Sequence, residues 1–192
     1  MKEKLKTKDL IYAGAFGALY LILVMMIVMG SGIIPVLYLI SPFTVGLICA
    51  TVYMLYVTKV QKPGAILILS ALFGLLTSTN SIFSLVWALL MGIIAELIVR
   101  AGKYNSKKMY TLSFYAFNLN MIGPFLMLVY AKNQFVSICA EYYGSEYAAA
   151  LDALTPGWII FALAALALLG AAAGTLLASR FMKKHFVKAG IA

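Results

Sequence analysis

The sequence is poor in charged residues, in cysteine and in histidine. Only 11% of its 192 residues are charged, 64% are hydrophobic, and the mean hydropathy is +1.00. Because a soluble domain has about 25% charged and roughly 45–50% apolar residues, this composition excludes a soluble globular domain and a disordered chain. Two cysteines and one histidine exclude a disulfide framework and a metal site built from several histidines. An all-α membrane protein is therefore predicted, with residues 1–192 in a single integral membrane domain.

The few charged residues are mostly basic, and the formal net charge is +9. A basic chain can bind nucleic acid, but here the charges form short runs between long apolar stretches. This arrangement is typical of membrane topology. The lipid bilayer is the expected partner, and nucleic acid is not.

Stretches without charge indicate the number of membrane spans. Residues 10–58 hold no Asp, Glu, Lys or Arg, and neither do residues 63–95. A bilayer core needs about 20 helical residues, so each stretch must contain two spans. The breaks are expected at a Gly- and Pro-rich loop over 31–41 and at the polar segment 77–81. Six transmembrane helices are predicted, near 10–30, 42–58, 64–78, 82–100, 110–131 and 156–179.

The distribution of basic residues tests this count. With six spans and a cytoplasmic start, 14 of the 15 basic residues lie inside, and only Lys132 lies outside. Five spans would divide them 7 to 8, without any preference. Because cytoplasmic loops are enriched in Lys and Arg, six spans with both termini in the cytoplasm are predicted. The chain is thus expected to be a multi-pass protein of a prokaryotic plasma membrane, and its outer segment 132–155 carries Glu141 and Glu146.

Glu96 is the ionisable residue that lies well within an apolar span. A carboxylate in that position is a candidate for coupling to protons or cations. Arg100 lies four residues further on, at the spacing of an intrahelical ion pair, and this favours a structural role. Both interpretations remain open, as does whether Glu141 and Glu146 meet a cationic ligand or face water.

The sequence does not predict an enzyme. No glycine-rich phosphate loop with a following lysine is present, and no acids and bases are placed to face one another within the spans. No catalytic residue, metal site or cofactor is assigned.

Small residues at four-residue spacing occur in the first and last predicted helices. Gly170 and Gly174 in the last helix are interpreted as packing sites within the chain's own bundle, because missing side chains let helices approach closely. For the first helix, internal packing and docking of an external membrane partner are equally supported. The candidate docking residues are Ala13, Gly14, Gly17 and Ala18.

The predicted outer half is rich in aromatic, amide and hydroxyl groups. Ligand pockets are mostly apolar and aromatic with a few polar groups, which these residues could supply. The alternative is an interfacial aromatic belt and amides that bridge helices. Pro124 is expected to kink the fifth helix. The candidate ligand-binding residues are Tyr38, Asn80, Ser84, Trp87, Asn120, Tyr130, Tyr143 and Trp158.

Several stretches together resemble one family of membrane proteins. They are KTKDLI at 6–11 with AGAFGALY at 13–20, GIIPVLYLI at 32–40, VYMLYVTKV at 52–60, IAELIVRAGKY at 94–104, MIGPF at 121–125, LTPGW at 154–158 and KKHFVKAGIA at 183–192. With six spans in about 190 residues, the chain resembles the S components of energy-coupling factor (ECF) transporters. Within these it is most similar to the Trep_Strep integral membrane family, also described as MptD-like.

The resemblance implies a function that needs partners. An S component captures a small organic micronutrient, such as a vitamin-like compound, outside the cell. It then docks on a T component that carries two cytoplasmic ATPases. Docking in this class uses an alanine-rich AxxxA pattern, to which Ala13 and Gly17 correspond here, with Gly14 and Ala18 offset by one residue. The ligand is expected between the outer ends of helices 4 to 6, under the loop that joins helices 1 and 2.

Two other interpretations remain. The chain could be an autonomous small transporter or channel that uses Glu96 as its coupling group. It could also be a membrane scaffold that binds a protein partner and transports nothing.

Overall fold

The computed structural model describes residues 5–79 and 81–181, and within these ranges the secondary structure is entirely helical. The elements are α1 (Thr7–Ser31), α2 (Pro35–Lys59), α3 (Ala65–Thr77), α4 (Ile82–Ala101), α5 (Lys107–Asn118), the 3₁₀ helix η1 (Leu119–Leu126), α6 (Met127–Tyr130), α7 (Lys132–Tyr143), α8 (Ser145–Leu154) and α9 (Ile159–Phe181).

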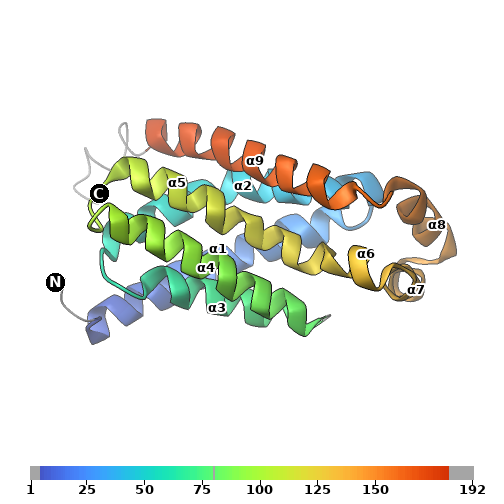
Figure 1. Ribbon diagram of the computed structural model, residues 1–192, viewed down its shortest axis with the longest axis horizontal. Helices are drawn as coiled ribbons and strands as arrows, with labels where there is room; N and C mark the ends of the chain where they lie inside the picture. Colours follow the sequence, from blue (N-terminus) through green and yellow to red (C-terminus); the bar gives the residue numbers. More distant parts are fainter. Residues whose placement is uncertain (1–4, 80, 182–192) are drawn as a thin grey trace.

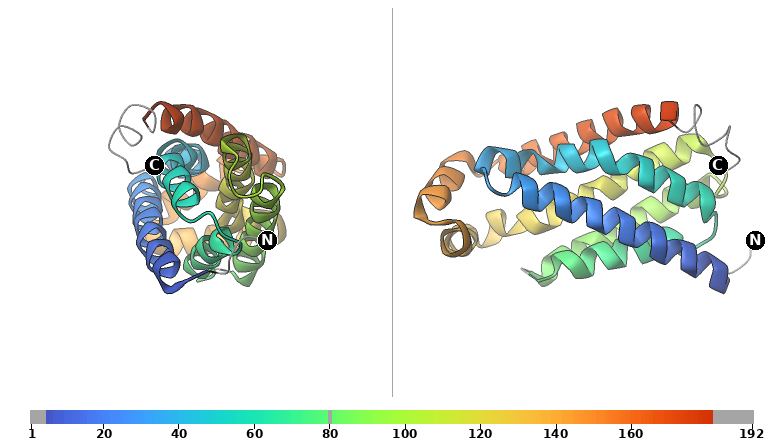
Figure 2. Two further views of the ribbon diagram at one scale, coloured as in Figure 1. Left: turned by 90° about the vertical axis from the view of Figure 1, so that its left-hand side faces the viewer. Right: turned by 180° about the vertical axis from the view of Figure 1, so that it is seen from behind.

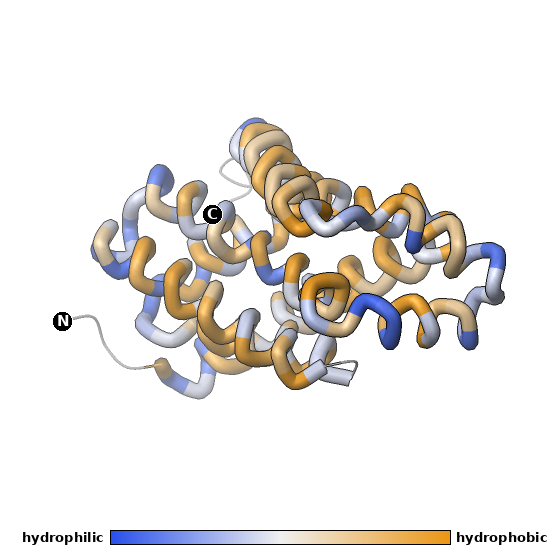
Figure 3. Tube along the Cα trace, turned by 45° about the vertical axis from the view of Figure 1, so that its right-hand side comes forward, coloured by the Kyte–Doolittle hydropathy of each residue, from blue (hydrophilic) through white to orange (hydrophobic). Residues whose placement is uncertain are grey.

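The long helices run side by side along the molecule's long axis (Figure 1). The start of α1, the start of α5 and the end of α9 lie at one end, while α7 and α8 cap the other (Figures 1 and 2). Basic residues at helix ends, among them Lys59, Arg100, Lys107 and Arg180, gather at the former, which we call the basic end. Figure 3 shows hydrophobic residues along the bundle and hydrophilic residues mostly toward its two ends. The expected all-α membrane fold is therefore confirmed.

Five helical segments are long and apolar enough to cross a membrane among the residues that the structure describes. They are Thr7–Ser31, Pro35–Lys59, Ile82–Ala101, Lys107–Tyr130 and Ile159–Phe181. The third predicted span is the shorter apolar helix α3, which has 13 residues. At a rise of about 1.5 Å per residue it extends roughly 20 Å, less than a bilayer core of about 30 Å.

The connection between α1 and α2 is shorter than predicted. Helix α1 continues to Ser31 and α2 begins at Pro35, so residues 32–34 replace the expected loop over 31–41. Proline is well tolerated at the first helical position, where its missing N–H costs no intrahelical bond. The second proline, Pro42, lies inside α2, and its carbonyl accepts a hydrogen bond from Asn118 Nδ2 at 3.2 Å. Proline here begins and shapes a helix and does not stop one.

The segment 132–155, for which no helix is predicted, is helical. It forms the helices α7 and α8, which turn at Gly144 with φ +93°, a conformation that glycine adopts without a steric cost. Lys132 Nζ forms an ion pair with Asp152 Oδ1 at 2.8 Å and joins the two ends of this segment. The predicted irregularity at Pro124 lies inside η1, where the fifth span departs from α geometry.

The most extensive helix packing joins α2 and α9. A Cβ atom at Gly170 would lie 2.7 Å from Phe43 Cα, and one at Gly174 would lie 2.8 Å from Ala50 Cβ. Real side chains do not approach backbone this closely, so glycine is required at these crossings. The interpretation of Gly170 and Gly174 as internal packing sites is confirmed. We call this α2–α9 contact the glycine seam.

Candidate functional site: a cavity beneath the α1–α2 turn

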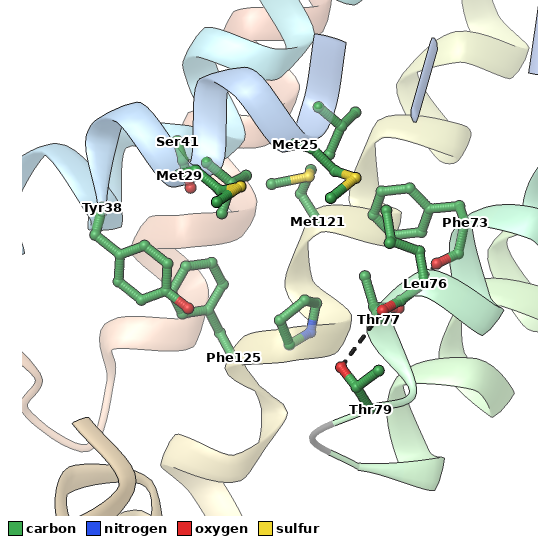
Figure 4. Close-up of a pocket in the computed structure, with 13 residues that line it drawn as sticks. Met25, Met29, Tyr38, Ser41, Phe73, Leu76, Thr77, Thr79, Met121 and Phe125 are labelled. Atoms are coloured by element: carbon green, nitrogen blue, oxygen red, sulfur yellow. Dashed lines mark hydrogen bonds between the residues drawn. The ribbon is translucent and has the colours of Figure 1, made fainter. Parts of the chain in front are cut away.

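A cavity of about 290 Å³ lies between α1, α2, α3 and η1, toward the end opposite the basic end (Figure 4). Its walls come from four elements: the end of α1, the start of α2, the end of α3 and η1. We call it the inner cavity. It is lined by Val24, Met25, Val28, Met29, Tyr38, Ser41, Phe73, Leu76, Thr77, Thr79, Met121, Pro124 and Phe125.

The walls of the inner cavity are mainly methionine and aromatic side chains. Met25, Met29 and Met121 surround its centre in Figure 4, and the rings of Tyr38 and Phe125 lie 5.0 Å apart. None of the described residues that line it is charged. Methionine is flexible and polarizable, and it contacts aromatic rings favourably. The cavity is thus suited to an apolar or aromatic molecule.

Three hydroxyl groups line the inner cavity besides that of Tyr38. Thr77 Oγ1 donates to Phe73 O at 3.1 Å, and Thr79 Oγ1 makes a long contact of 3.5 Å with Leu76 O (Figure 4). Ser41 is completely buried, and its Oγ has no hydrogen-bond partner among the described residues. A buried hydroxyl without a partner is costly, so Ser41 is the polar group most in need of one.

A second cavity of about 310 Å³ adjoins the first and shares Val28, Met29 and Tyr38 with it. We call it the outer cavity, because α7 and the start of α8 cover it with Tyr142, Tyr143 and Tyr147. The rings of Tyr143 and Tyr147 stack at 4.7 Å with an interplanar angle of 24°. Burial raises the pKa of Tyr147 to about 12, so its hydroxyl is neutral at physiological pH. The remaining residues of the outer cavity are Met127, Phe135, Ile138 and Cys139.

The predicted ligand-binding residues do not all come together. Tyr38 lines both cavities, and Tyr143 lines the outer one. Trp87 Nε1 instead donates to Leu119 O at 2.8 Å and fastens α4 to η1. The hydroxyl of Tyr130 lies 2.6 Å from Ser81 Oγ, at the head of α4.

Ser84, Asn120 and Trp158 line neither cavity. Ser84 and Asn120 are buried and have no side-chain hydrogen bond among the described residues. Trp158 is 62% exposed, as expected of an interfacial residue, and Asn80 lies outside the residues that the structure describes. Both cavities lie beside α1 and α2, near the turn under which the ligand is expected, and the described residues of helix 4 do not line either of them.

Sequence reasoning missed most of the inner cavity's wall. Met25, Met29 and Met121 carry no sequence signal that separates a cavity lining from an ordinary core. Only the tertiary structure shows that these methionines face one another. Glu141 and Glu146 are exposed and line neither cavity.

The carboxylate of Glu96 holds the start of α3. Gly64 N–H and Tyr104 Oη–H both donate to Glu96 Oε1 at 2.9 Å, and Ile66 N–H donates to Oε2 at 3.2 Å. The first N–H groups of a helix lack intrahelical partners and carry a partial positive charge, so a carboxylate stabilises them. Glu96 acts as an N-cap supplied by a neighbouring helix.

Tyr104 completes this arrangement from the turn after α4. Burial and the hydrogen bond to Glu96 raise the pKa of Tyr104 to about 12, so the hydroxyl keeps its proton near neutral pH. The predicted ion pair between Glu96 and Arg100 is not formed in the described part of the chain. The reason is that backbone N–H groups of α3 already occupy the carboxylate.

The small residues of α1 divide into two faces. Ala13 and Gly17 are buried, and a Cβ at Gly17 would lie 3.0 Å from Leu72 Cδ1 of α3. Gly14 and Ala18 are exposed, and a Cβ at Gly14 would meet nothing within 4 Å. Only Gly14 and Ala18 remain accessible to another molecule.

The family model described as "hypothetical bacterial integral membrane protein (Trep_Strep)" matches residues 7–188. The chain belongs to the Trep_Strep family. The match covers every helix of the described structure, so a multi-pass protein of the bacterial membrane is supported by both family and fold. No curated protein and no solved structure matches the Trep_Strep chain significantly.

Proposed function

We propose that this Trep_Strep protein is the substrate-binding S component of an ECF-type importer. The observation that carries the proposal is the inner cavity, which is hollow, mostly apolar, and built from four elements at one end of a membrane bundle. Its volume is close to the lower limit of the about 300–1,000 Å³ typical of small-molecule sites. A small organic compound would fit there.

The orientation follows from charge. Basic residues concentrate at one end of the bundle, and such residues are retained on the cytoplasmic side. The cavities then lie toward the outer side, where a scarce compound is captured. In this topology α3 completes six crossings as a short helix, and both termini are cytoplasmic.

Uptake against a gradient requires an energy source. Ligand binding alone can shift the protein between states only by the difference of its affinities for them. Glu96 is held by three hydrogen-bond donors at the start of α3, which supports a structural role over one in ion coupling. The energy would come from a T component and two cytoplasmic ATPases.

The exposed face of α1 is the proposed docking surface for the T component. Gly14 and Ala18 lie on this face, where missing side chains permit close helix contact. Gly17, in contrast, packs against Leu72 inside the bundle, so its substitution would disturb the fold as well.

The test is recovery of the tagged chain from its native membrane in mild detergent, with mass spectrometry of bound proteins. The wild type should retain a multispan T protein and ATPase subunits. Gly14→Leu should reduce their recovery at least tenfold, because the new side chain separates the helices, with an unchanged melting temperature. Gly30→Leu is the matched control, since Gly30 is equally exposed on α1 and also meets nothing within 4 Å.

Three results would contradict the proposal. Recovery of the wild-type chain alone, with uptake into liposomes that is lost in Glu96→Gln, would identify an autonomous transporter. Recovery of a partner without ATPases, and without flux, would identify a scaffold. Full partner recovery by Gly14→Leu would remove this face of α1 from the docking surface.

A further inference from the structure

We propose that the compound taken by the inner cavity is uncharged, carries an aromatic or other flat apolar ring, and forms a hydrogen bond with Ser41. This inference rests on the proposed function, because it names the class of substrate for the same site. Three independent observations on the described residues support it: the walls carry no charged side chain, they consist mainly of methionine and aromatic side chains, and the buried hydroxyl of Ser41 has no hydrogen-bond partner.

The absence of charged residues from the described cavity walls disfavours ionic ligands. Within the described structure no Asp, Glu, Lys, Arg or His lines either cavity. An ion that leaves water needs an opposite charge or several strong hydrogen bonds in return. The end of α3, at Thr77, presents the weakly negative end of a helix, but this is a much smaller effect than the loss of an ion's hydration. An uncharged compound is thus preferred over both a cation and an anion.

The wall chemistry favours a flat ring. Three methionine side chains and the Tyr38–Phe125 pair face the same space, with Phe73 on the side of α3 (Figure 4). Thioether groups and aromatic edges both make favourable contacts with ring faces and edges. A purely aliphatic chain, such as a lipid tail, would use the apolar surface but none of these directional contacts.

Ser41 distinguishes a ligand from a lipid tail. It lies in the second turn of α2, is completely buried, and has no hydrogen-bond partner among the described residues while it lines the cavity. Serine in a helix commonly bonds to its own backbone, as Thr77 does to Phe73 O. Ser41 does not, so its hydroxyl remains available to a polar atom of the ligand.

Binding of three matched probes to the purified full chain in lipid nanodiscs tests the inference. The probes are 2-naphthalenemethanol, 2-naphthoate and 2-naphthylmethylammonium, which share one ring system and differ in charge. Saturable binding is measured after subtraction of binding to empty nanodiscs. We expect the neutral alcohol to bind at least tenfold more tightly than either ion. An ion that binds as tightly as the alcohol, or failure of all three to bind saturably, would overturn the inference.

The variant Ser41→Ala tests the proposed hydrogen bond in the same binding experiment. It should weaken binding of the alcohol about three- to tenfold, the size of one net hydrogen bond, and leave 2-methylnaphthalene unaffected, since that probe has no hydroxyl. Ser70→Ala is the control, because Ser70 is equally buried but its Oγ already donates to Ala88 O, away from the cavity lining. An affinity for the alcohol that Ser41→Ala leaves unchanged would overturn the proposed hydrogen bond with Ser41.

This outcome is separable from that of the proposed function. The probe experiment needs neither a T component nor ATP, so it can succeed even when no partner is recovered. Conversely, recovery of the transport complex with a charged compound bound would uphold the proposed function and refute this inference alone.

Discussion

The two sides of the bundle differ in how closely their helices approach one another. At the glycine seam, α2 and α9 approach so closely that even one added carbon at Gly170 would collide with the backbone of Phe43. On the other side, α1 and α3 stand far enough from η1 to leave the inner cavity, and the space around Gly14 and Gly30 of α1 is open.

This difference assigns a separate task to each side. The seam joins residues far apart in the sequence and holds the bundle in one arrangement. Asn118 strengthens it, because its Nδ2 donates to Pro42 O at 3.2 Å and to Ala167 O at 2.7 Å. The looser side carries the cavities and the accessible face of α1, where a ligand or partner would act.

The largest effect is expected from Gly170→Leu at the glycine seam. Its side chain cannot be accommodated without separating α2 from α9, so the loss of stability should exceed about 3 kcal/mol. That corresponds to a fall in melting temperature on the order of 10 °C, measured by thermal unfolding of the detergent-solubilised protein. Gly14→Leu on the looser side should cause no comparable change. Equal melting temperatures for the two variants would show that the sides do not differ in packing.

An intermediate effect is expected at the basic end from Glu96→Leu. The substitution leaves the N–H groups of Gly64 and Ile66 and the hydroxyl of Tyr104 without their acceptor. We expect a loss of about 2–3 kcal/mol, since each unsatisfied buried donor costs about 1–3 kcal/mol and water near the turn offsets part of it.

Tyr104→Phe serves as the partial control, because it removes one of the three bonds. It should cost about 1 kcal/mol in the same unfolding measurement. Stability unchanged in Glu96→Leu, together with lost transport, would instead favour a coupling role for this carboxylate.

Smaller effects than that of Glu96→Leu, and of opposite sign to each other, are expected from two buried amides. Asn120→Leu should raise stability by about 1 kcal/mol, because the Asn120 amide has no partner among the described residues. Asn118→Leu should instead lower stability by about 1–2 kcal/mol through the loss of two bonds at the seam. Thermal unfolding of the two variants shows whether each melting temperature rises or falls relative to the wild type. A destabilised Asn120→Leu would indicate a bond that the side chain makes in the membrane.

Much of the fold could be predicted from the sequence because membrane insertion depends on local composition. Long uncharged stretches place α1, α4, α9 and the segment Lys107–Tyr130 within three residues of their predicted ranges, whereas α2 begins seven residues before its predicted start. The four-residue spacing of Gly170 and Gly174 likewise predicted that the last helix packs within the bundle, since two small residues one turn apart lie on one helix face, but it did not name α2 as the partner.

The errors had a common physical origin. A Gly- and Pro-rich loop is predicted over 31–41, but Pro35 is compatible with the first turn of α2, and Pro42 is accommodated inside this helix, where its carbonyl bonds to Asn118. Arg100 was the expected partner of Glu96 from its spacing, but the start of α3 outcompetes it. Rules based on the spacing of neighbouring residues cannot predict a hydrogen-bond partner that lies on another helix.

Hydropathy and charge along the chain suffice to predict a membrane environment, the approximate span boundaries and the concentration of basic residues on one side. These depend on hydropathy and charge, which are properties of neighbouring residues. Only the tertiary structure decided that Gly14 is accessible while Gly17 is buried, that Glu96 caps α3, and that Ser41 faces a methionine-lined cavity. Such facts depend on which helix faces are in contact, and this is settled by packing among segments far apart in the chain.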